Sequence, residues 1–173
     1  MAALLLTACA HEESGHGFRV DAVRVEPGYR NLSAQFDQHL RLSREAATAL
    51  DHGVPLHISI DMELRDSRTL ALLTNSTRSF ELRYLPLSRH YRLTGPEQVE
   101  VRTFPRLRHA LGALSDIRLV MDTGALAPGR YEFRTRVRLE RSRLPAPMQL
   151  PARFSAEWRL DSSWSTWPFR ISA

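Results

Sequence analysis

The 173-residue sequence contains no lysine, only one cysteine and no long apolar run. A single cysteine cannot form an internal disulfide, so the fold depends on its hydrophobic core. No apolar run reaches the ~18 residues that a membrane-spanning helix needs. All 24 basic residues are arginines, which against 19 acidic residues gives a net charge of +5. Arginine-only usage is typical of GC-rich genomes, and the alternative explanation is attraction to an anionic partner.

The first residues combine a short apolar segment with the lone cysteine. Leu6-Thr7-Ala8-Cys9 resembles the lipobox of bacterial lipoproteins, in which the chain is cut before a cysteine whose thiol carries a diacylglycerol. The apolar segment is shorter than the usual length of about 7–15 residues, and no basic residue precedes it. An ordinary cleaved signal peptide and residence in the cytoplasm therefore stay open as alternatives.

The domain organisation follows from this interpretation. We expect a signal and lipobox segment over residues 1–9, a polar tether over residues 10–17 and a single β-rich domain over residues 18–173. The expected location is the periplasm, with the protein anchored to a membrane through Cys9.

Alternation of apolar and polar residues predicts a mainly β domain. Residues 54–65 alternate almost perfectly, and residues 31–42 do so with Gln38 as the one polar interruption on the apolar side. Such alternation is typical of antiparallel sheets with one buried face and one wet face. Further strands are expected over residues 18–25, 79–85, 99–103, 117–121, 131–139 and 153–160, and near Phe169. We therefore expect an antiparallel β-sandwich, immunoglobulin-like, or a partly open barrel.

Two short helices are predicted between the strands. Ser43 is a suitable N-cap for the first helix, which Gly53 ends. The second covers residues 105–114, where apolar residues recur at helical spacing. Both are too short to be stable without packing on the sheets.

Prolines and aromatic residues predict the structure of the C-terminal third. Three prolines indicate a stiff, extended crossover before the expected strand 153–160. They are Pro145, Pro147 and Pro151. Within that strand Trp158 is in phase with Phe154 and Leu160, so these three side chains are expected in the core.

Three motifs of this sequence resemble a known family. They are residues 82–91 (LRYLPLSRHY), residues 142–150 (SRLPAPMQL) and residues 157–167 (EWRLDSSWSTW). They are similar to the proteobacterial domain of unknown function 4390, and the resemblance covers roughly residues 18–169. It implies an exported protein and supplies no catalytic residues.

An arginine stripe is the first candidate binding surface. Arg134, Arg136 and Arg138 lie on one side of the expected strand 131–139, about 7 Å apart, and Arg141 and Arg143 continue the basic run. These groups would repel one another unless acidic neighbours or an anionic ligand offset their charge. The expected acidic neighbours are Glu63, Glu132, Glu140 and Glu157.

Trp164 and Trp167 form the second candidate surface. They follow the turn at residues 161–163 and either lock the C-terminal strand onto a sheet edge or expose an aromatic patch to a partner or a membrane.

The sequence contains no motif for catalysis or metal binding. HExxH, GxSxG and glycine-rich phosphate loops are all missing, so we expect no enzyme, cofactor or metal. We expect an exported binding or adaptor domain whose partner is another envelope protein. The alternatives are binding of an anionic envelope lipid or polysaccharide by the arginine stripe, and an uncharacterised hydrolase. No nucleic-acid partner is expected for an exported protein.

Overall fold

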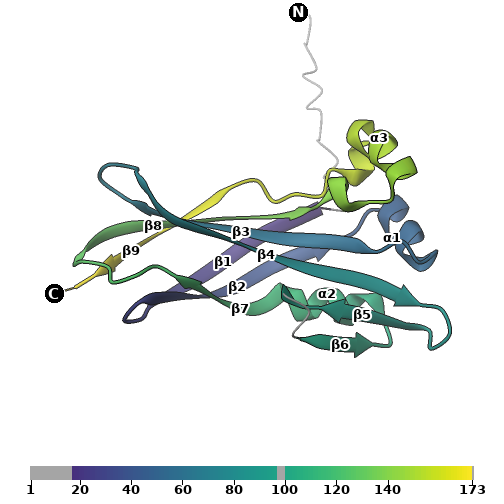
Figure 1. Cartoon of the computed structure of the whole chain (residues 1–173), viewed down its shortest axis with the longest axis horizontal. Helices are drawn as coiled ribbons and strands as arrows, with labels where there is room; N and C mark the ends of the chain where they lie inside the picture. Colours follow the sequence, from purple (N-terminus) through teal and green to yellow (C-terminus); the bar gives the residue numbers. More distant parts are fainter. Residues whose placement is uncertain (1–16, 97–99, 173) are drawn as a thin grey trace, which may run out of the picture.

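The strands form two antiparallel sheets that pack face to face (Figure 1). The computed structural model describes residues 17–96 and 100–172. In these residues the strands are β1 (Gly17–Pro27), β2 (Asn31–Arg41), β3 (Leu56–Asp66), β4 (Leu72–Leu85), β5 (His90–Thr94), β6 (Val101–Phe104), β7 (Asp116–Asp122), β8 (Gly129–Leu139) and β9 (Ser165–Ile171). The predicted mainly β, antiparallel fold is confirmed, and its two layers are arranged as in a sandwich.

Strand order places β3 and β8 side by side in the middle of the larger sheet. The smaller sheet has the order β1-β2-β7, and the larger has the order β6-β5-β4-β3-β8-β9. Every pairing between neighbouring strands is antiparallel. The smaller sheet packs against only part of the larger one, so a second element must cover the rest of the apolar face.

Helices complete this cover. The helical segments are α1 (Arg44–Asp51), α2 (Leu107–Ser115), α3 (Ala146–Phe154) and the 3-10 turns η2 (Arg141–Arg143) and η3 (Ala156–Trp158). Helix α2 contacts β2, β5 and β6, and so closes the part of the larger sheet that the smaller sheet leaves open. Helices α1 and α3 lie at one end of the sandwich (Figure 1).

Side chains from both sheets fill the space between the layers. Phe36 of β2 and Phe133 of β8 are fully buried, and their rings meet edge to face with centroids 6.2 Å apart. The central strand β3 contributes its whole apolar side, all of it buried. These residues are Leu56, Ile58, Ile60, Met62 and Leu64.

A polar contact defines the start of the first predicted helix, and another joins the second to the smaller sheet. The hydroxyl of Ser43 accepts a hydrogen bond from the backbone N–H of Ala46 at 3.1 Å, which confirms the predicted N-cap. Gln38, the one polar residue on the apolar side of β2, is buried, and its side-chain amide donates to the carbonyl of Leu114 in α2 at 2.7 Å. The interruption in the alternation is therefore a link between β2 and α2.

The prediction of a strand over residues 153–160 is wrong. Helix α3 ends at Phe154 and η3 follows, so the two-residue period does not apply there. Trp158 and Leu160 are buried as predicted, but Phe154 is 81% exposed.

The prediction of an extended, proline-rich crossover is also wrong, because these residues form α3. Pro145 occupies the N-cap position and Pro147 lies in the first turn, where a helix needs no backbone N–H from the residue. Pro151 removes one donor from the helix, and α3 ends three residues later.

Strand β5 was not expected from the sequence. It pairs with the C-terminal half of β4 through a short turn over residues 86–89, where Arg89 adopts a positive φ of 56°. The strand expected over residues 79–85 is in fact the second half of the longer β4.

Because Phe36 packs on Phe133 in the core, shortening its side chain should destabilise the protein. Phe36→Ala should lower the free energy of unfolding by about 3–5 kcal/mol, because it leaves a cavity between the sheets. Urea unfolding followed by fluorescence measures this change. Phe154→Ala is the matched control, since the same substitution at an exposed ring should change stability by no more than about 0.5 kcal/mol. Equal losses in the two variants would contradict the observed burial.

Candidate functional site

The arginine stripe faces a row of carboxylates on the neighbouring strand. In the pairing of β3 with β8, Asp61 lies opposite Arg136 and Glu63 lies opposite Arg134. Asp61 Oδ2 is 2.8 Å from Arg136 Nη2 and 2.9 Å from Arg138 Nε. We call Asp61, Glu63, Arg134, Arg136 and Arg138 the ionic ladder. Its position on the outer face of the larger sheet follows directly from the alternation of β3 and β8.

Glu63 is the second carboxylate of the ionic ladder. Its Oε2 atom is 2.9 Å from Arg65 Nη2 and 3.5 Å from Arg134 Nη1. The expected offset by Glu63 is thus confirmed, whereas Asp61, the partner of two arginines, was not anticipated. The structure therefore holds the stripe in ion pairs, and its role in binding a partner stays a prediction.

Asp61 is held in the charged form by its neighbours. Burial acts to raise the pKa of this carboxyl, but hydrogen bonds from Arg138, Arg136 and Thr77 outweigh it and bring the pKa below its ordinary value. The buried hydroxyl of Thr135 also donates to the Asp61 backbone carbonyl at 2.9 Å. These contacts join β4, β3 and β8 at a single residue.

The two candidate tryptophans lie on opposite faces of the larger sheet. The Trp164 ring stands against the ionic ladder, with the guanidinium carbons of Arg136 and Arg134 at 4.8 and 5.2 Å from its centroid. Trp167 is instead packed against the core, opposite Phe133 in the pairing of β8 with β9. They do not form one aromatic patch, and the contacts of Trp167 are those of a residue that locks β9 onto the sheet.

The last two arginines of the basic run, Arg141 and Arg143, lie in η2 and not on β8. Arg141 donates to the carbonyl of Ala152 in α3 at 3.4 Å. Arg143 turns toward β4, where Nη1 donates to Ser79 Oγ at 3.1 Å and Nε is 3.9 Å from Glu140 Oε2. The stripe thus divides into three paired arginines on β8 and two arginines that reach other elements.

Arg143 is part of a second basic surface that the sequence analysis missed. A groove of about 530 Å³ crosses the start of β3, the second half of β4 and strand β5. We call it the basic groove, and its lining residues are His57, Ser79, Glu81, Arg83, Arg92, Thr94, Gly95, Val101 and Arg143. Three guanidinium groups face it, together with the carboxylate of Glu81.

Two of these arginines are placed directly opposite each other. Arg83 and Arg92 are partners in the pairing of β4 with β5, an arrangement in which like charges repel. Glu81 Oε1 is 3.0 Å from Arg83 Nε but 3.9 Å from Arg92 Nη2, and Arg92 Nε is buried without a hydrogen-bond partner in the described residues. Guanidinium groups in this state can bind a further carboxylate or phosphate.

His57 forms the buried floor of the basic groove. Burial is the main cause that lowers its pKa, and the charge of Arg143 acts in the same direction, although Glu81 opposes both. Burial of the ring therefore disfavours the charged form of His57.

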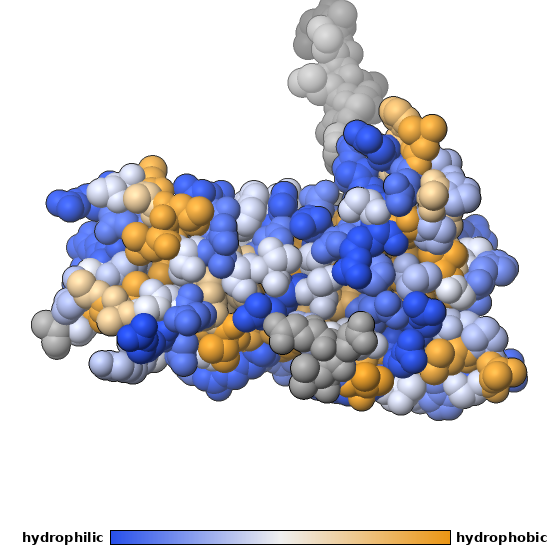
Figure 2. Space-filling model, viewed as in Figure 1, coloured by the Kyte–Doolittle hydropathy of each residue, from blue (hydrophilic) through white to orange (hydrophobic). Residues whose placement is uncertain are grey.

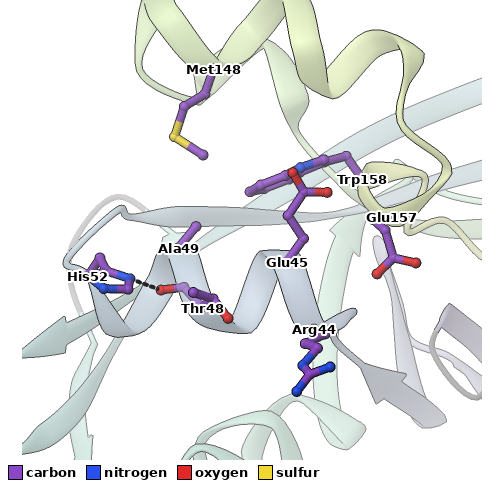
Figure 3. Close-up of a pocket in the computed structure, with 8 residues that line it drawn as sticks. All are labelled: Arg44, Glu45, Thr48, Ala49, His52, Met148, Glu157 and Trp158. Atoms are coloured by element: carbon purple, nitrogen blue, oxygen red, sulfur yellow. Dashed lines mark hydrogen bonds between the residues drawn. The ribbon is translucent and has the colours of Figure 1, made fainter.

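A second groove, of about 500 Å³, lies between α1 and the α3–η3 segment (Figure 3). Its floor is largely apolar, formed by Ala49, Met148 and Trp158. Polar residues of α1 lie at its rim, where His52 Nδ1 is 2.7 Å from the Thr48 carbonyl. Among the described residues no group of three or more potential ligands could hold a metal ion here or elsewhere.

The predictions about the N-terminus cannot be placed in the structure. Cys9, the lipobox and the tether over residues 10–17 fall on residues 1–16, outside the described part except for Gly17. In the part that is described, every helix is too short or too polar to cross a bilayer.

The fold and its two grooves define a β-sandwich module with a basic surface, and comparison with known proteins supplies the family. The chain belongs to the domain of unknown function family DUF4390, which it matches over residues 15–168. The predicted resemblance is therefore confirmed over most of the chain. No curated protein and no solved structure matches it.

The position of Asp61 predicts a pH-dependent loss of stability. Asp61→Asn should lower the free energy of unfolding at pH 7 by about 2 kcal/mol, less than for a fully buried pair because both arginines are partly exposed. A lowered folded-state pKa stabilises the protein above the ordinary pKa of 3.8, and this contribution disappears as the pH falls through the folded-state value. Urea unfolding from pH 7 to pH 3 should show the gap between the two proteins closing only at the acid end.

Asp37→Asn is the control for this experiment. Asp37 is exposed on β2, so the same change of charge should alter stability by no more than about 0.5 kcal/mol. A gap between wild type and Asp61→Asn that is constant down to pH 3 would contradict the assigned ion pairs.

Proposed function

We propose that the protein is a non-catalytic binding module of the bacterial envelope, anchored through Cys9, that holds an acidic segment of another envelope protein in the basic groove. The observation that carries this proposal is the direct pairing of Arg83 with Arg92 across β4 and β5, with a single shared carboxylate beside them. An arrangement that costs stability in the isolated chain is relieved when a partner supplies carboxylates.

The neighbouring strand favours a polypeptide as the ligand. Strand β6 is the edge of the larger sheet, and its first residue, Val101, lines the basic groove. A free edge can accept an extended segment through backbone hydrogen bonds, and side chains of that segment would then enter the groove. Val101 is more than half exposed and adds an apolar contact.

The ionic ladder is the weaker candidate for this role. Arg136 and Arg138 already share Asp61 at hydrogen-bond distance, whereas Arg92 and Arg143 approach carboxylates only at 3.9 Å. An anionic ligand at the ladder would have to displace Asp61 from two arginines, whereas Arg92 in the basic groove has a buried Nε without a hydrogen-bond partner in the described residues. This contrast supports the groove over the stripe as the binding surface.

Photocrosslinking in intact cells tests the proposed partner. A photoreactive residue at Val101 should form a discrete protein adduct, and Arg92→Gln with Arg143→Gln should weaken that adduct at least about tenfold, because two charge-assisted contacts are lost. Immunoblotting measures the adduct, and urea unfolding of the double variant shows that the fold is intact.

Val120 is the matched control position for the crosslinker. It is also an exposed valine, on the edge strand β7 of the other sheet, and should give no such adduct. Arg24→Gln with Arg30→Gln, two exposed arginines away from the groove, should leave the adduct at Val101 unchanged. An adduct of lipid or polysaccharide at Val101, or one insensitive to the groove substitutions, would contradict the proposal.

The anchor is tested separately by metabolic labelling. Radiolabelled fatty acid should be incorporated into the wild-type chain and not into Cys9→Ser, because the thiol is the acceptor of the diacylglycerol. Gel electrophoresis followed by autoradiography measures incorporation. Equal label in both proteins, or label in neither, would show that Cys9 is not the site of attachment.

A further inference from the structure

Helix α3 turns an apolar stripe outward. Pro147, Leu150, Pro151 and Phe154 recur at the spacing of one helical face, and all four are exposed, Leu150 at 65% and Phe154 at 81%. The opposite side of the helix is the one that packs on the protein, where Ala152 is buried. Apolar side chains are visible at this end of the molecule (Figure 2). We call these four residues the α3 stripe.

The charge around the α3 stripe is positive. Over residues 141–159, which include η2, α3 and η3, four arginines stand against one acid, with Arg143 turned toward the basic groove and Glu45 of α1 bonded to Ser155 at the end of α3. They are Arg141, Arg143, Arg153 and Arg159, and the acid is Glu157. An apolar helix face flanked by arginines matches an interface of acyl chains and anionic headgroups.

The chain enters the domain at the same end. Gly17, the first residue of β1, pairs with Arg41 at the end of β2, and α1 begins three residues later at Arg44. Helix α1 contacts η3, which in turn contacts α3. Cys9 precedes Gly17 by eight residues, so it lies at most about 28 Å from this end of the sandwich.

We infer that the α3 stripe docks on an anionic lipid bilayer. The contact with lipid is made by α3 itself. The orientation of the domain on the bilayer rests on the proposed anchor at Cys9. Strands of 11 residues span about 36 Å, so the turn between β3 and β4 at the other end is held away from the bilayer, and the basic groove, lined by His57 and Arg143, lies nearer to the bilayer on the outer face of the sheet.

Vesicle binding by the unacylated chain tests this inference. The full-length Cys9→Ser protein should sediment with vesicles of equimolar phosphatidylcholine and phosphatidylglycerol. Leu150→Ser with Phe154→Ser should lower its partition coefficient at least about tenfold, because two exposed apolar side chains are removed from the contact. Vesicles of phosphatidylcholine alone should bind it at least about threefold more weakly.

Leucines at the far end provide the matched control. Leu72 and Leu73 are also exposed, and Leu72→Ser with Leu73→Ser should leave vesicle binding within about twofold of the parent. In the same background, brominated lipids should quench the fluorescence of Phe154→Trp and not that of Leu73→Trp.

Several results would overturn the inference. They are the absence of binding by the Cys9→Ser chain, equal binding by the α3 double variant, and equal quenching at the two tryptophan positions. A dimer in sedimentation equilibrium that the α3 substitutions dissociate would assign the stripe to a second copy instead. None of these results depends on acylation or on the partner, so failure here is distinct from failure of the proposed function.

Discussion

The alternation of β3 is the constraint on which the rest of the structure depends. This strand lies between β4 and β8, so its two sides define both faces of the larger sheet. Its apolar side is buried against the smaller sheet, and its polar side presents His57, Asp61 and Glu63 to the neighbouring strands. A shift of one residue in register would bury these charges and expose the core, so packing fixes the position of every polar group on the outer face.

The arginines of the larger sheet have two kinds of cross-strand neighbours. On β8 they lie opposite acids of β3, and the attraction between partners stabilises the pairing of the two central strands. On β4 and β5 two arginines, Arg83 and Arg92, lie opposite each other and share Glu81. The first arrangement pairs opposite charges, while the second places like charges opposite each other with Glu81 between them. Like charges placed opposite each other break the pattern of opposite charges that β3 and β8 follow.

Much of the fold could be predicted from the sequence, because alternation and capping are local signals. The strands around β3 and β8, the Ser43 cap and the second helix all follow from residue spacing. The prediction failed at residues 145–160, where a run with three prolines suggested extended chain. Proline is also compatible with the first turn of a helix, and only the packing of Ala152 and Trp158 shows which of the two forms.

The candidate site was less accessible to sequence analysis. The arginine stripe was visible as a two-residue period, but its partner Asp61 could be identified only from the register of β3 with β8. The basic groove depends on the β4–β5 hairpin, whose second strand was not expected. The sequence Leu85-Pro86-Leu87-Ser88 between two arginine-bearing segments was the one signal for that turn, and recognising it would have brought Arg83 and Arg92 together.

The positions of the two surfaces are compatible with simultaneous use. The α3 stripe lies at the end of the sandwich where the chain enters β1, and the basic groove opens on the outer face of the larger sheet. A module held at its end leaves that face, and the edge of β6 beside it, open to a second protein. His57 near the start of β3 and Arg143 in η2 line the groove, so it lies toward the end of the sandwich that carries α1 and α3 (Figure 1). Attachment and recognition would then occupy neighbouring surfaces, one on α3 and one on the outer face of the larger sheet close to it.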